Sequence, residues 1–169
     1  MLSFSRGLIL SALGIGGIGN VMNGGVIRIF SGLRPVNASA AVPPSSAATV
    51  LGKVTMEGRT FYADTDPEQA GLQLRITDDG FLENYGRWVL SVTKTGVPTW
   101  FRWTWGKTDN DDDSFYYPRI DGLVTAFDVE SEEYSLATEN IGIVLPVSEL
   151  SAGQSITISE MKMWFNGME

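Results

Sequence analysis

The chain has 169 residues, with 12 basic and 20 acidic side chains, a formal net charge of −8, and neither histidine nor cysteine. The negative charge argues against a general nucleic-acid binder. The missing residue types exclude Ser-His-Asp and Cys-His catalysis, His/Cys zinc sites and disulfides. Apolar residues make up 43% of the chain, so we expect a sizeable core.

The charge is unevenly distributed along the chain. Residues 1–50 carry three bases, Arg6, Arg28 and Arg34, and no acid, whereas residues 51–169 carry all the acids. This pattern predicts a weakly basic arm before an acidic body, so copies of the chain could attract one another, arm to body. The alternative is a loosely structured N-terminus that merely has few charges.

Residues 1–25 are predicted to form a short helix followed by a glycine-rich arm. Ser3 or Ser5 would cap a helix that ends before the glycines, with Phe4 and Leu8 on one face.

Three other interpretations of this arm are disfavoured. The apolar stretch is too short and too rich in glycine for a membrane-spanning helix. A cleaved signal peptide is disfavoured because the nearest small-residue cleavage pattern, at residues 38–40, lies too far downstream. The glycines of residues 14–19 have the spelling of a dinucleotide-binding turn, but no strand precedes them and no acid follows at the required distance.

Residues 26–169 are predicted to form a single all-β domain. Short runs of alternating or β-branched residues, separated by Gly, Pro, Asn and Asp, are typical of an antiparallel β-sandwich of eight or nine strands, jelly-roll-like or immunoglobulin-like. The expected strands are residues 26–30, 50–56, 60–63, 72–76, 88–93, 99–105, 120–127, 141–145 and 155–165.

The run from Thr99 to Trp105 is the most unusual strand because it is so rich in aromatic residues. Alternation places Phe101 and Trp103 on one face and Trp100 with Arg102 on the other. We expect the Phe101 face to pack in the core and Trp100 to cover an edge or an interface. The alternative is an aromatic platform for glycans made of Trp100, Trp103, Tyr116 and Tyr117.

Acidic side chains supply two further hypotheses. Asp109, Asp111 and Asp113 have the spacing that opens a calcium loop, but Ser114 and Ile120 stand where an EF-hand needs Gly and Glu. We therefore predict a solvated acidic hairpin tip, with a looser calcium site as the alternative. A glycosidase needs two facing carboxylates, and no pair stands out, so we predict no catalytic residue, no cofactor and no metal ligand.

Residues 23–35 read Asn-Gly-Gly-Val-Ile-Arg-Ile-Phe-Ser-Gly-Leu-Arg-Pro. This stretch resembles the opening of a group of small virion proteins of tailed bacteriophages, in which a short helix and a glycine-rich break precede an Ile-Arg-Ile strand. Looser similarities to the same group cover residues 38–42, 51–55, 100–102, 119–122 and 141–165. The resemblance implies a non-enzymatic structural component of the virion, assembled in the host cytoplasm.

The first candidate role is a capsid cement or decoration protein that stabilises the particle through multivalent contacts. The alternatives are a tail or head–tail connector component and a carbohydrate-binding receptor module. We expect other virion proteins as partners and a homo-oligomer, with no nucleic acid and no membrane. Deleting residues 1–22 should then leave a folded body that no longer incorporates. The predicted interface residues are Phe4, Arg6, Leu8, Leu10, Arg28, Arg34, Trp100 and Arg102.

Overall fold

A computed structural model describes residues 3–5, 17–61, 70–76, 78, 82–105, 111–113, 116–126, 142–158 and 162–163. In this part of the chain there are eleven strands and one short helix, and the predicted all-β fold is confirmed. The elements are β1 (Ser3–Phe4), α2 (Ile18–Met22), β2 (Val26–Gly32), β3 (Ala48–Met56), β4 (Gln73–Ile76), β5 (Leu82–Tyr85), β6 (Trp88–Val92), β7 (Trp100–Thr104), β8 (Arg119–Ala126), β9 (Gly142–Leu145), β10 (Ser155–Ile158) and β11 (Lys162–Met163).

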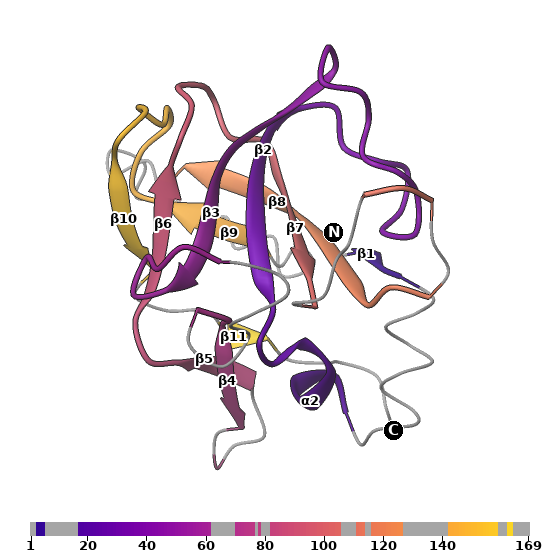
Figure 1. Cartoon of the computed structure of the whole chain (residues 1–169), viewed down its shortest axis with the longest axis vertical. Coiled ribbons are helices and arrows are strands. Elements are labelled where there is room, and N and C mark those ends of the chain that lie inside the picture. The colour runs from indigo at the N-terminus through magenta and orange to yellow at the C-terminus, as the bar shows by residue number, and fades with distance from the viewer. Residues whose placement is uncertain are drawn as a thin grey trace, which may run out of the picture.

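The strands form two unequal sheets (Figure 1). The larger sheet has eight strands in the order β1-β8-β7-β2-β3-β6-β10, with β9 also paired to β8, and the smaller has the order β11-β5-β4. The strand pairs are antiparallel except for β8 and β9, which run parallel. The strand β2, which carries the Ile-Arg-Ile sequence, lies in the middle of the large sheet.

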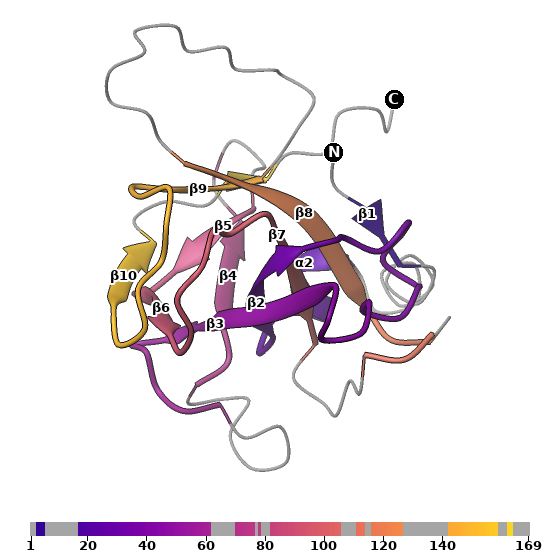
Figure 2. The ribbon, with the colours of Figure 1, turned by 90° about the horizontal axis from the view of Figure 1, so that it is seen from above.

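The large sheet curves around the main core, so that β9 lies behind β3 and β6 (Figures 1 and 2). Residues paired across neighbouring strands share a face of a sheet. One such row runs across five strands and is buried throughout; its members are Leu90, Val54, Ile27, Trp103 and Ile120. The small sheet contributes Leu82 to the same core. The alternation of side chains between the two faces of these strands therefore places one set of residues in the core, as the sequence pattern predicts.

The expected strands are found with two differences in the described residues. Residues 60–61 are not in a strand, and the last expected strand, 155–165, is divided between β10 in the large sheet and β11 in the small one. The strand β5 was not predicted, because Leu82-Glu83-Asn84-Tyr85 contains two polar residues and lacks β-branched ones.

The N-terminus differs from its prediction. Residues 3–4 form β1, paired with β8, and not the start of a helix. The hydroxyl groups that were expected to cap a helix accept hydrogen bonds from distant backbone instead: Ala38 N–H donates to Ser3 Oγ at 3.0 Å, and Arg119 N–H to Ser5 Oγ at 2.8 Å. The predicted helix beyond Ser5 lies outside the described residues.

The described parts of the predicted arm pack against the rest of the chain. The helix α2 places Val21 and Met22 in the main core, and β1 belongs to the large sheet. The described parts of residues 1–25 are therefore integrated into the domain. No helix in the described residues is both long and apolar enough to cross a membrane.

Candidate functional site

A row of polar residues crosses the outer face of the large sheet, opposite the core. The cross-strand register pairs Arg28 on β2 with Arg102 on β7, Arg102 with Asp121 on β8, and Asp121 with Ser3 on β1. All four therefore lie on one face and at one level of the sheet. Strand alternation explains why, since each is flanked by residues that face the other side.

Arg102 and Asp121 form the centre of this row. Arg102 Nε donates to Asp121 Oδ1 and Arg102 Nη2 to Asp121 Oδ2, both at 2.8 Å, while the two side chains are 0% and 1% exposed. This two-point geometry is the strongest that an arginine and a carboxylate can adopt. Arg102 Nη2 also donates to the carbonyl oxygen of Ala40 at 3.0 Å, which ties the loop after β2 to the sheet.

A second ion pair connects the sheet to the segment between β7 and β8. Both terminal nitrogens of Arg28 donate to the carboxylate of Asp111, and the two side chains are 13% and 25% exposed. The same carboxylate lies 3.9 Å from Arg102 Nη1. Asp111 is therefore shared between two strands of the sheet.

The two segments that cover this face also bind each other. Ala41 N–H donates to Asp113 Oδ1 at 2.7 Å, and Val42 N–H donates to the carbonyl oxygen of Asp111 at 2.9 Å. Arg119 Nη1 donates to the carbonyl oxygen of Asp112 at 2.9 Å. We call residues 38–42 and 111–113 together the cover.

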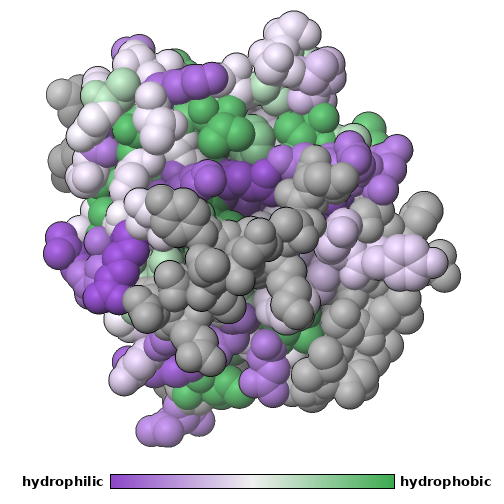
Figure 3. All heavy atoms as spheres, viewed as in Figure 1, coloured by the Kyte–Doolittle hydropathy of each residue, from purple (hydrophilic) through white to green (hydrophobic). Residues whose placement is uncertain are grey.

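Beneath the cover lies a small apolar cluster that is separate from the main core. Phe30 and Trp100 stack with ring centroids 4.0 Å apart and planes at 5°, and Ala48 completes the buried part. Val42 from the cover packs against them. The outer face of β2 and β7 is thus buried by the chain's own loops, and Figure 3 shows a hydrophilic band next to hydrophobic patches on this side of the molecule.

Burial dominates the electrostatics of Asp121. The loss of hydration raises the pKa of this carboxyl above its ordinary value. The hydrogen bond and positive charge of Arg102, and the charges of Arg119 and Arg34, act in the opposite direction without cancelling the effect of burial.

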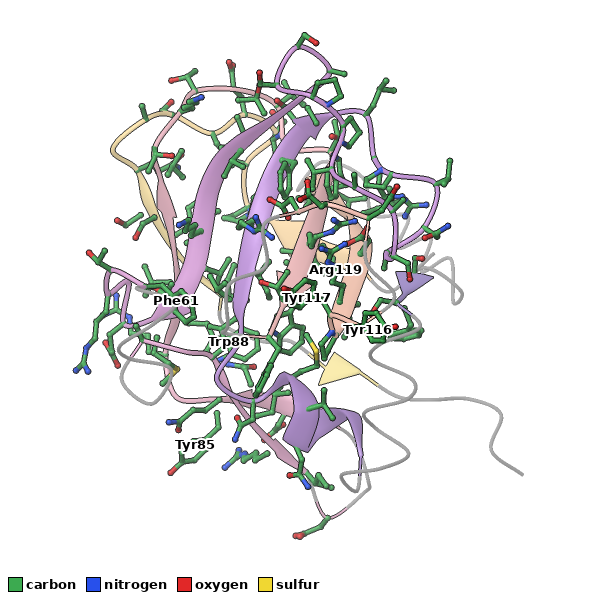
Figure 4. The ribbon with its side chains drawn as sticks, turned by 45° about the vertical axis from the view of Figure 1, so that its right-hand side comes forward. Phe61, Tyr85, Trp88, Tyr116, Tyr117 and Arg119 are labelled. Carbon is green, nitrogen blue, oxygen red and sulfur yellow. The ribbon has the colours of Figure 1, made fainter. Side chains whose placement is uncertain are left out.

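An aromatic side chain lies next to Arg119, at the start of β8. The guanidinium carbon of Arg119 is 5.6 Å from the ring centroid of Tyr117, within the range of a cation–π interaction, and Figure 4 shows the two residues side by side. Tyr116 is 86% exposed and Tyr117 is 37% exposed.

The structure describes five of the eight predicted interface residues. Trp100 and Arg102, expected at an edge or an interface, are buried within the chain, and this prediction is corrected because the cover already occupies their face. Arg28, also among the predicted interface residues, pairs with Asp111 of its own chain. Phe4 and Arg34 are half-buried. The remaining three, Arg6, Leu8 and Leu10, lie outside the described residues.

The prediction of an aromatic platform for glycans is also corrected in part. Trp100 and Trp103 are buried, so neither can stack on a sugar ring in this structure, whereas Tyr116 and Tyr117 remain accessible.

Two of the three ligands proposed in the calcium hypothesis already have partners within the chain. Asp111 is paired with arginines and Asp113 accepts a backbone hydrogen bond, while Asp109 lies outside the described residues. Within the described residues, no group of three acidic side chains is placed to hold a metal ion.

Sequence reasoning missed the pairing of Arg102 with Asp121. One signal was present: each is a charged residue in the middle of an apolar strand, the two strands follow one another in the chain, and the charges are opposite. Buried charges are found in pairs because a lone buried charge is too costly. Comparison with protein-family models, with curated proteins and with solved structures finds no match to this chain.

Proposed function

We propose that this chain is a non-enzymatic structural protein of a tailed-bacteriophage virion, with capsid cement or decoration as its first candidate role. The proposal rests on the resemblance carried by residues 23–35. What supports it is the position of this stretch in the fold: it builds the central strand β2 and the turn that leads into the cover.

Three residues of this stretch have a clear structural role. Arg28 holds Asp111 of the cover. Gly32 turns the chain out of β2 with a φ of 86°, and its missing side chain leaves room for the carbonyl oxygen of Ala47. Pro35 is buried in the loop that follows. These residues of the motif therefore serve to build the fold, and none of them is a nucleophile or part of an acid–base pair. A motif of this kind fits a structural component.

Contacts with partners would then come from exposed side chains of the folded body. Large apolar side chains that are exposed in the described residues include Leu33, Val36, Val97, Leu123 and Val144. A cement protein binds its lattice in many copies, so individually small contacts of this kind can add up through multivalency. The proposed partners are other virion proteins and further copies of the same chain.

The test is to purify particles from cells that carry this gene and to measure the chain's copy number against the major capsid protein by quantitative mass spectrometry. Hundreds of copies per particle are expected for a cement or decoration protein. A dozen copies or fewer would replace that role with the tail or connector alternative. Absence from purified particles would overturn the virion proposal altogether.

A further inference from the structure

We propose that Asn23 is a site of deamidation that the fold holds closed. It reacts only when residues 22–25, which we call the corner between α2 and β2, separate from residues 72–74, to which they are hydrogen-bonded. The isoaspartyl product then keeps the corner from returning to its place. This inference goes beyond the proposed function and does not depend on it.

The reaction begins with an attack within the main chain. The backbone nitrogen of Gly24 bonds to the side-chain carbonyl carbon of Asn23, and the amide nitrogen leaves as ammonia with the proton that the Gly24 nitrogen gives up. Water then opens the resulting succinimide ring at one of its two carbonyl groups. Opening at one carbonyl gives aspartate, and opening at the other gives isoaspartate, in which the main chain passes through the former side chain. Asparagine is thermolabile for this reason, most of all before glycine, whose nitrogen no side chain shields.

The corner requires the glycine that makes Asn23 reactive. The helix α2 ends at Met22 and β2 starts at Val26, so three residues must join them. Gly24 has a φ of 82°, a conformation that side chains rarely adopt. Asn23 itself is exposed, so water reaches its side chain. The fold therefore fixes a reactive dipeptide at a position that solvent reaches.

Both reacting groups are engaged while the corner is closed. The N–H of Gly24 donates to the carbonyl oxygen of Leu72 at 2.8 Å, and Asn23 Oδ1 accepts the N–H of Leu74 at 3.0 Å. The ring also requires the Gly24 nitrogen to eclipse the Cβ of Asn23, whereas Asn23 has an extended ψ of 134°, which rotates that nitrogen away. Attack therefore needs the main chain to turn and these hydrogen bonds to break, and local opening of this kind is an equilibrium with its own free energy.

The product does not fit the closed corner. Leu72 is fully buried, and its N–H donates to the carbonyl oxygen of Gly25 at 2.8 Å, so a pair of backbone hydrogen bonds fixes the corner against it. Isoaspartate adds one carbon atom to the main chain before Gly24 and shifts this pairing. Little room is left for a bulge, because a Cβ on Gly25 would already lie 2.5 Å from the carbonyl oxygen of Thr104. A shifted corner also displaces Met22 from the main core.

The experiment keeps the full chain at mildly alkaline pH and measures the conversion of Asn23 by peptide mass spectrometry, with aspartate and isoaspartate separated by chromatography. A synthetic peptide of residues 19–28 gives the rate without the fold. The folded chain should react at least about tenfold more slowly, which corresponds to about 1.4 kcal/mol for opening the corner. Denaturing urea should bring the rate in the chain to that of the peptide.

Leu74 offers a matched pair of variants. Leu74→Pro removes the N–H that Asn23 accepts, whereas Leu74→Ala keeps this N–H and loses the contacts of the leucine side chain with the core. Deamidation should be about two- to tenfold faster in Leu74→Pro than in Leu74→Ala, the range for one hydrogen bond. If Leu74→Pro fails to fold, the wild type in urea replaces it, and the reaction should then accelerate at urea concentrations below the global unfolding transition.

The two products are compared by urea denaturation. Asn23→Asp reproduces the aspartyl product with the same main-chain length, and it should unfold close to the wild type because its carboxylate still accepts the N–H of Leu74. The purified isoaspartyl chain should unfold at a clearly lower urea concentration. Equal rates of deamidation in the folded chain and the peptide, or in the two Leu74 variants, would overturn the closed site. An isoaspartyl chain as stable as Asn23→Asp would overturn the claim that the product keeps the corner open.

Discussion

Arg102 and Asp121 are two charged residues that this chain buries away from solvent. Both side chains are fully buried between the sheet and the cover, and both oxygens of Asp121 accept a hydrogen bond from Arg102. Burying an ion pair costs hydration free energy that the attraction between the charges does not always recover. We expect such a pair to contribute less to stability than to specificity, because any other register of β7 against β8 would leave two buried charges apart.

The raised pKa of Asp121 predicts the direction of a pH dependence. Its folded value lies above the unfolded one of about 3.8, so the folded chain binds this proton more tightly, and the stability contributed falls as pH rises through the folded pKa. Asp121→Asn removes that titration. From about pH 4 to about pH 8 the free energy of unfolding of the wild type, minus that of the variant, should decrease, as measured by urea denaturation. An increase would mean that Arg102 outweighs burial.

At the scale of elements, the strands were largely predictable and their cover was not. The β-branched run of residues 26–30, bounded by glycines, and the apolar run of residues 88–93 identify β2 and β6, as expected for strands that are largely buried on both faces. The burial of Trp100 could not be predicted, since it depends on packing against Phe30, Ala48 and Val42, which are distant from it in the sequence. The strand β1 is too short to show a periodicity, and Ser3 and the following Ser5 are residue types that also favour a helix cap.

The turn that starts the cover gives an element-level prediction. A side chain at Gly32 would bring Cβ to 2.1 Å from the carbonyl oxygen of Ala47, in a backbone conformation with φ of 86°. Gly32→Ala should therefore lower the free energy of unfolding by about 3 kcal/mol or more, as strain and a backbone clash combine. Urea denaturation measures the change.

Gly153→Ala is the matched control for this substitution. Gly153 has a φ of 87°, but no atom of the described residues lies within 4 Å of an added Cβ. Its cost should be limited to the backbone conformation, about 1 kcal/mol. Equal losses at the two positions would show that the close approach to Ala47 does not matter.

For the whole molecule, the described residues of the predicted N-terminal arm pack together with the domain that was predicted to begin at residue 26. β1 completes one edge of the large sheet, Ser5 is buried and bonded to Arg119, and α2 delivers Met22 to the main core. The charge asymmetry along the chain remains, but it does not mark a structural boundary. Charge patterning describes composition, whereas a boundary depends on which side chains are buried together.

Deleting residues 1–22 should therefore destabilise the chain, contrary to the expectation from the sequence that a folded body would remain. Truncating a single buried methionine typically costs about 2–5 kcal/mol, and this deletion removes Met22, Val21 and the whole of β1. Thermal unfolding followed by circular dichroism should show a much lower midpoint or no transition. A chain without residues 1–2, which keeps β1, is the control and should unfold like the wild type. An unchanged midpoint after the larger deletion would show that residues 1–22 form an independent arm. Only in that case would failure of the truncated chain to enter particles indicate a loss of adhesion and not a loss of folding.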